Sequence, residues 1–374
     1  MSLDRRKFLN LSAAFAAFAS ASPALSRRSF AQAAKDPLVE RALQKKEQEI
    51  IIAGGSGAYL DAAKKAFYDP FTEATGIRIT PVPVPYGEKL TKLKAMTEVN
   101  RVEWDVVTGP VDLLVPKTKQ FLRDLGDCSE LPNVAKHGID GACLGQGILF
   151  DTGGAPLVYS TEAFPDGQPQ PQSWADFWDV ERFPGPRALP NVSLPWWPLM
   201  AALQADGVPS DKLFPLDLDR AFKKMDEIKP HVTVWWKSGD QSQQIFRSKE
   251  VVMSMMYSGR ALKLQNEGLP VKLVWNGAPM DAAFWAITKE APHPNAAMAF
   301  FNFVMTRPEA HAEYARTLFY DTSNKDALSL LSEEERRSRA SHPDNWKGLV
   351  QVDKPWVASN RDQVIERWVA WIAS

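Results

Sequence analysis

The sequence predicts an α/β protein of two lobes, each built on a mainly parallel sheet flanked by helices. Short apolar runs alternate with amphipathic stretches along the chain, which is the pattern of strands and helices in a layered fold. The length of 374 residues is enough for about two to three domains. A stretch containing Pro, Gly and Gln at residues 164–172 interrupts the alternation and divides it into two sets of elements.

The first set has the order β-α-β-α-β. A β-branched run at 49–53 predicts a buried strand, and a glycine-rich turn at 54–57 leads from it into a helix over 60–73. Gly76 ends that helix, because glycine readily adopts the left-handed conformation that closes a helix. The pattern then predicts a strand over 77–84, a helix over 86–97 and a strand over 104–108. Units of this kind form parallel sheets with right-handed crossovers.

The second set runs from the helix start at 173–176 to about residue 274, and a further strand and helix follow it. The pattern predicts strands over 251–257 and 285–288 and helices over 216–228, 241–247 and 295–305, the last capped by Asn295. Ligands of such folds bind at the carboxyl ends of strands and often between lobes. Functional residues are therefore expected at 54–57, 108–109, 258–260 and around 281.

Residues 1–33 are predicted to be an export signal of the twin-arginine type. Arg5 and Arg6 precede an apolar, alanine-rich run at 9–21, and residues 31–33 offer a cleavage site of small residues. The alternative is a frayed helix with a chance arginine pair. Export would bring the chain into the oxidising periplasm, where Cys128 and Cys143, 15 positions apart, can form a disulfide. The alternative for the cysteines is two buried free thiols.

The composition argues against several classes of protein. Lys plus Arg is 44 and Asp plus Glu is 45, so there is no basic excess that would suit nucleic acid. Two cysteines and five histidines exclude a Cys-rich zinc module. The sequence contains neither a phosphate-binding P-loop motif nor a His-Glu-x-x-His motif. We therefore expect no cofactor, no metal site, no catalytic residues and no nucleic-acid partner.

Residues suited to binding are better represented. Trp197 lies in a proline-flanked tryptophan pair, and an aromatic face attracts cations and stacks on flat ligands, although most tryptophans belong to cores. Arg260 follows a predicted strand, where it can clamp a carboxylate or form a structural salt bridge. Asp281 can pair with an amine or cap a turn. Gly55 and Ser56 lie at a helix start, where backbone N–H groups suit an anionic ligand group.

Motifs spread along the chain carry a family resemblance. They are FTEATGI at 71–77, WDVV at 104–107, SWADFW at 173–178, MMYSG at 255–259, PNAA at 294–297 and YDTSN at 320–324. The mature chain resembles the extracellular solute-binding proteins of ABC importers, in the group that includes the spermidine/putrescine-binding protein. The resemblance implies a type II-like periplasmic-binding-protein fold, whose two lobes close on a ligand by hinge motion.

This resemblance also implies an organisation and partners. The N-terminal lobe is expected to comprise 34–157 and 282–325, and the C-terminal lobe 158–281 and 326–374. The protein is expected to be a periplasmic monomer that binds a small molecule and delivers it to ABC permease subunits in the inner membrane. An exported hydrolase that uses the same cleft is the alternative.

The ligand residues that the resemblance implies are Tyr257, Asp281, Tyr320 and a position near Thr108. The two further acids of the family's polyamine site fall near Leu194 and Trp197, which are not acidic. Burying a second ammonium group without a carboxylate is costly. Arg260 would also repel a diamine and attract an acid. One amine partner and one guanidinium favour an ω-amino acid of the γ-aminobutyrate kind, with a polyamine as the other hypothesis.

Overall fold

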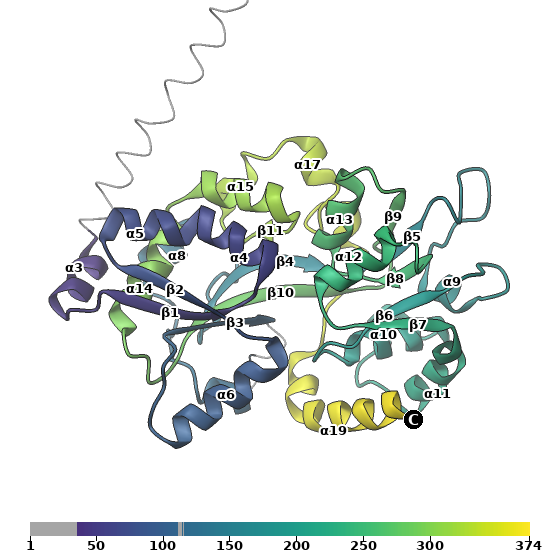
Figure 1. Cartoon of the computed structure of the whole chain (residues 1–374), viewed down its shortest axis with the longest axis horizontal. Coiled ribbons are helices and arrows are strands. Elements are labelled where there is room, and N and C mark those ends of the chain that lie inside the picture. Colours follow the sequence, from purple (N-terminus) through teal and green to yellow (C-terminus); the bar gives the residue numbers. More distant parts are fainter. Residues whose placement is uncertain (1–35, 111–113, 115) are drawn as a thin grey trace, which may run out of the picture.

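The structure is a computed structural model that describes residues 36–110, 114 and 116–374, so the predicted export signal lies outside the described residues. Figure 1 shows two β-sheets, each covered by helices, lying side by side. The first has the order β11-β4-β10-β3-β1-β2, with β12 beside β10. Its strands are β1 (Glu49–Gly54), β2 (Arg78–Pro83), β3 (Val106–Pro110), β4 (Ile148–Gly154), β10 (Ala278–Ile287), β11 (Asp321–Thr322) and β12 (Leu349–Val350).

The second sheet has the order β7-β6-β8-β5-β9. Its strands are β5 (Leu157–Ser160), β6 (Arg187–Pro190), β7 (Val232–Trp236), β8 (Met253–Met255) and β9 (Val271–Val274). This two-sheet α/β arrangement is the one that the sequence predicts.

Both sheets are mixed, whereas the sequence predicted mainly parallel ones. β1, β2 and β3 are parallel, but β10 runs antiparallel to both β3 and β4. β10 follows β9 of the second sheet, so it enters the first sheet from the side where β3 and β4 end. In the same way β5 arrives from the first sheet and pairs antiparallel with β8 and β9. The reversed strands thus result from the chain crossing between sheets, which no local pattern reveals.

Helices bury an apolar face against each side of the first sheet. One side is covered by α3 (Pro37–Gln44), α4 (Gly57–Ala63), a π-helical turn (Lys64–Tyr68), α5 (Asp69–Thr75), α8 (Pro132–His137), α14 (Pro294–Val304) and α15 (Pro308–Leu318). α6 (Tyr86–Glu98) packs on the other side through Leu93. Gly76 ends α5 with a φ of 76°, as expected for a left-handed helix end.

The second sheet is enclosed in the same manner. α9 (Trp174–Trp178), α10 (Trp196–Ala205), α11 (Leu218–Ile228) and α19 (Lys354–Ala373) cover one side, and α12 (Gly239–Arg247) and α13 (Ser258–Asn266) the other. The short helices α7 (Pro116–Lys119), α16 (Lys325–Leu328), α17 (Glu333–Arg337) and α18 (Pro343–Trp346) lie in connections. The C-terminal helix α19 runs along the second lobe in Figure 1.

Within the described chain, the passages between the sheets differ slightly from the predicted lobe boundaries. Sheet membership places the first two passages at residues 155–156 and 275–277, a few residues before the predicted ends at 157 and 281. β12 pairs with β10 of the first sheet, although residues 326–374 were assigned to the second lobe. The division into lobes otherwise stays a prediction.

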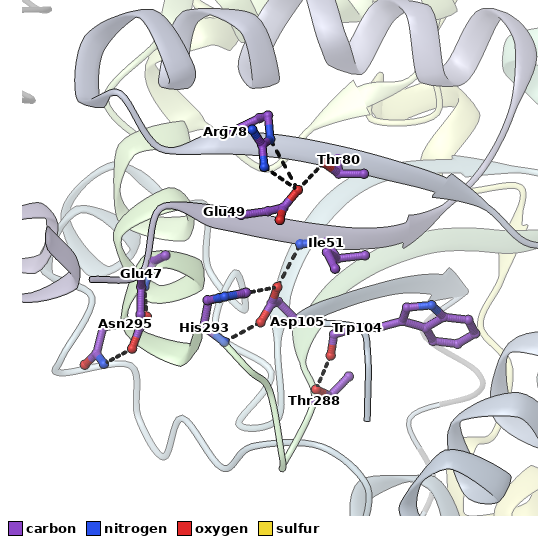
Figure 2. Close-up of polar contacts among 11 residues, drawn as sticks. Glu47, Glu49, Ile51, Arg78, Thr80, Trp104, Asp105, Thr288, His293 and Asn295 are labelled. Carbon is purple, nitrogen blue, oxygen red and sulfur yellow. Dashed lines mark hydrogen bonds and ion pairs between the residues drawn. The ribbon is translucent and has the colours of Figure 1, made fainter. Parts of the chain in front are cut away.

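A buried carboxylate ties together the strands of the first sheet (Figure 2). Asp105 is fully buried and accepts hydrogen bonds from the backbone N–H of Ile51 at 2.7 Å and of His293 at 2.5 Å, and it contacts His293 Nδ1 at 3.1 Å. His293 is the residue before α14, so the prediction that Asn295 caps this helix is wrong. The Asn295 side chain instead donates to Glu47 Oε1 at 2.6 Å.

Cys128 and Cys143, the disulfide candidate, are joined by a disulfide, with Cα atoms 6.0 Å apart. The bridge connects the loop before α8 to the segment that leads into β4. It closes a loop of 15 positions next to the buried core of the first sheet.

Candidate ligand-binding site

A cavity of about 720 Å³ is lined by residues of both sheets. The ends of β1 and β4 and the start of β10 meet there, because β10 enters the first sheet where the other two strands leave it. From the second sheet come the turns after β6, β7 and β8, together with α19. A volume of this size is typical of sites for small solutes.

The structure brings together most of the residues that the sequence singled out. Gly55, Ser56, Asp281 and Tyr320 line the cavity from the first sheet and its helices, and Tyr257 and Arg260 line it from the second lobe. The Tyr320 ring lies against Gly153 of β4, where a Cβ atom would be 3.0 Å from the ring. A side chain at position 153 would therefore push this tyrosine out of its place.

Thr108 and Trp197, two further candidate ligand residues, are not among the residues that line the cavity. Thr108 is buried in β3, where its carbonyl oxygen and hydroxyl accept hydrogen bonds from Lys89 Nζ at 2.9 and 3.1 Å. Trp197 is fully buried in α10, because the proline before the tryptophan pair begins a helix and does not hold a loop. Its ring packs edge-on against Tyr257 at 5.6 Å between centroids. Trp197 thus supports a residue that lines the cavity.

Arg260 forms an ion pair inside the cavity with Asp240, a residue that no sequence motif singles out. Its Nη1 lies 3.1 Å from Asp240 Oδ1, and both residues line the cavity. The Arg260 side chain is only 13% exposed and that of Asp240 62% exposed. Gly239 makes room for the guanidinium, since a Cβ there would lie 2.8 Å from Nε. The sequence feature that could have indicated Asp240 is its position just before the helix expected over 241–247, where a strand leads into a helix.

Asp151 is a second cavity residue that no sequence motif singles out. It lies on β4, opposite Ala283 of β10, while Asp281 lies opposite Gly153. Tyr314 and Tyr59 donate hydroxyl hydrogen bonds to Asp151 Oδ2 at 2.9 and 3.2 Å. Burial raises the pKa of the Asp151 carboxyl to about 6, against the opposing effect of the two hydroxyl donors. The sequence feature that could have indicated Asp151 is an acidic residue within an otherwise apolar run that forms a strand.

The cavity lining is rich in carboxylates. Glu88, Asp151, Asp240 and Asp281 are the acids among the described lining residues, and Lys237 and Arg260 are the bases. This excess of negative charge suits a ligand that carries an ammonium group. The Arg260 guanidinium gives the cavity one position that suits a carboxylate.

Across 36–110, 114 and 116–374, no cluster of His, Cys, Asp and Glu could hold a metal ion. No helix in these ranges combines the length and the apolar character that a membrane span needs.

Two α/β lobes with a cavity lined by residues of both sheets define a protein that binds a small ligand. The chain matches the family described as bacterial extracellular solute-binding protein over residues 66–337. It therefore belongs to that family. This membership confirms the predicted family, the fold class and the solute-binding function. It favours a solute-binding protein over the exported hydrolase that was the alternative.

Relatives of known function agree with this assignment. The γ-aminobutyric acid-binding protein of Pseudomonas aeruginosa is 31% identical, over 89% of this chain and 93% of that protein. The spermidine/putrescine-binding periplasmic protein of Salmonella typhimurium is 26% identical, over 74% and 79%. The crystal structure of an ABC transporter substrate-binding protein from Bradyrhizobium japonicum superposes with a TM-score of 0.78 at 33% identity, covering 87% of this chain and 99% of that one.

Proposed function

We propose that this chain is the periplasmic solute-binding component of an ABC importer, and that its ligand is an ω-amino acid of the γ-aminobutyrate kind. One observation carries the choice of ligand. The cavity holds the guanidinium of Arg260 on the wall of the second lobe and the carboxylates of Asp281 and Asp151 on the wall of the first. A ligand with a carboxylate at one end and an ammonium at the other would bridge the two walls.

Each part of such a ligand has a partner in this arrangement. Arg260 presents N–H donors that match a carboxylate, and Asp281 offers a charge-assisted hydrogen bond to an ammonium group. Tyr257 and Tyr320 would cover the methylene groups between the two ends. The relative from Pseudomonas aeruginosa, which is named for γ-aminobutyric acid, supports the same choice.

A polyamine is the second candidate, and the number of carboxylates in the cavity favours it. Asp240 neutralises Arg260, which reduces the repulsion that a diamine would meet. Against it, Leu194 and Trp197 are buried apolar residues, so neither supplies the further acid expected near these positions in polyamine sites.

Calorimetric titration of the mature protein (residues 34–374) with γ-aminobutyrate and with putrescine tests the proposal. The variant D281N should weaken binding of both ligands by about tenfold or more, because it removes a charge-assisted hydrogen bond worth about 1.5–3 kcal/mol. R260M should abolish γ-aminobutyrate binding and leave or improve putrescine binding. A matched control is R247M, since Arg247 pairs with Glu267 on the surface and does not line the cavity.

The proposed ligand would be wrong if putrescine bound the wild-type protein more tightly than γ-aminobutyrate and R260M changed neither affinity. Unchanged binding in D281N would remove Asp281 from the site.

Export and assembly complete the proposal. We expect the twin-arginine segment to direct the folded chain to the periplasm, where it acts as a monomer and meets the permease subunits. Replacing Arg5 and Arg6 with lysine should leave the protein in the cytoplasmic fraction of the cell. Periplasmic accumulation of that variant would contradict a twin-arginine signal.

A further inference from the structure

The ion pair between Asp240 and Arg260 occupies the place where a ligand carboxylate would bind. Arg260 extends into the cavity from the first turn of α13, and Asp240 lies in the first turn of α12. Asp240 Oδ1 is 3.1 Å from Arg260 Nη1, the distance of a direct ion pair. The carboxylate of the chain itself therefore holds a position on the guanidinium that an acidic ligand needs.

The same carboxylate also reaches toward the opposite lobe. Gly57 begins α4 on the first lobe, and a Cβ atom at that position would lie 3.2 Å from Asp240 Oδ2. Gly57 has a φ of +59°, and its lack of a side chain leaves room for the approach. Asp240 thus lies between Arg260 of its own lobe and the backbone of the other lobe, as a bridging ligand would.

Asp240 is also free to leave this position at small cost. Its side chain is 62% exposed, so its carboxylate can turn into water, whereas the Arg260 side chain is 13% exposed and stays in the cavity. Because the Asp240 carboxylate is already mostly hydrated, turning it away from the guanidinium costs it little solvation free energy. A ligand carboxylate can therefore take the place of the Asp240 carboxylate, because it neutralises the Arg260 guanidinium in the same way.

We propose that Asp240 is an internal competitor that occupies Arg260 in the empty protein and sets the preference of the cavity between acidic and purely cationic ligands. This inference rests on the proposed function. A ligand that carries a carboxylate must displace Asp240 from Arg260. A diamine leaves the pair intact, and the neutralised guanidinium does not repel it.

The variant D240N separates competition from simple positioning. If Asp240 competes, the Kd of γ-aminobutyrate should fall about fivefold in D240N, and the Kd of putrescine should rise by a similar factor, because Arg260 is left uncompensated. If Asp240 merely orients Arg260, γ-aminobutyrate binding weakens instead, and the inference is overturned. The control is D219N, which removes an exposed Asp–Arg pair with Arg367 away from the cavity lining and should change neither Kd.

A second measurement does not depend on the identity of the natural ligand. Acetate should raise the melting temperature of D240N but not that of the wild-type protein, because only the variant leaves the guanidinium open to a free carboxylate. Equal shifts in both proteins would overturn the role of Asp240. If the wild-type protein bound neither γ-aminobutyrate nor putrescine, the proposed ligand would fail, while the acetate comparison would still decide on Asp240.

Discussion

The carboxyl group of Asp151 is buried beside two tyrosine hydroxyls at the wall of the cavity. Burial penalises its ionised form, and the hydrogen bonds from Tyr59 and Tyr314 stabilise that form in part. The net result is a pKa of about 6, above the ordinary value of 3.8. Between these two pH values the folded protein binds more protons at this residue than the unfolded chain does.

The stability of the wild-type protein relative to D151N should therefore fall as the pH rises from about 4 to about 6. By linkage the difference in unfolding free energy reaches at most about 3 kcal/mol and levels off above that range. Urea unfolding of both proteins across the range measures it. Y314F should extend the fall to higher pH, because it removes a donor to the ionised carboxyl. A pH-independent difference between wild type and D151N would contradict the raised pKa.

Single residues of the site were partly predictable from sequence. Arg260 stands out because it closely follows a strand, where charged side chains face a cleft in this class of fold. Asp281 lies inside β10, near its start, and was indicated by the family resemblance. Asp151 and Asp240 escaped because their roles depend on partners far away in the chain, such as Tyr314 and Arg260. Trp197 lies in a buried helix and not in a loop, because a proline-flanked pair of aromatic residues is compatible with either.

Among the elements, β1 and β3 depend on the buried carboxylate that lies just before β3. Asp105 accepts hydrogen bonds from the N–H groups of Ile51 and His293, and so connects β1 to the start of α14 (Figure 2). Without it, both N–H groups lose their acceptor inside the protein. An unsatisfied buried donor costs about 1–3 kcal/mol.

The variant D105A should lower the unfolding free energy by about 3 kcal/mol or more, since two buried donors are affected. Denaturant unfolding measures the loss. E49Q is a suitable control from the neighbouring part of the network, because Glu49 is part-exposed and forms a surface ion pair with Arg78 at 3.2 Å. Its effect should stay below about 1 kcal/mol. An equal loss of unfolding free energy in the two variants would show that the burial of Asp105 does not increase its contribution to stability.

Helices and strands followed the sequence pattern closely where the signal was local. The helix over 86–97 appears as α6 (Tyr86–Glu98), and the left-handed Gly76 ends α5 as expected. The Asn295 cap failed because the helix begins at Pro294, so that Asn295 is already inside it, with its side chain hydrogen-bonded to Glu47. The direction of β10 could not be predicted, since it depends on how the chain passes between sheets.

At the scale of the whole molecule, the two walls of the cavity belong to different sheets, and the chain passes between these sheets several times. A ligand that touches Arg260 and Asp281 together would favour the closed arrangement of the lobes, because it binds that state better than any open one. A ligand at 100 times its Kd contributes about 2.7 kcal/mol to the state that binds it.

Small-angle scattering of the mature protein should therefore show a smaller radius of gyration with saturating γ-aminobutyrate than without it. R260M should show no such change at the same concentration. Identical scattering curves for the free and saturated wild-type protein would mean that the lobes do not close on this ligand.

The packing around Tyr257 has an optical consequence. This tyrosine lines the cavity, and its ring centre lies 5.6 Å from that of Trp197 and 5.4 Å from that of Trp236. Both indoles are fully buried and so shielded from water. A ligand placed against Tyr257 would change the surroundings of two shielded fluorophores at once. The intrinsic emission of the protein should thus report the filling of the cavity without any attached dye, which makes the molecule its own sensor.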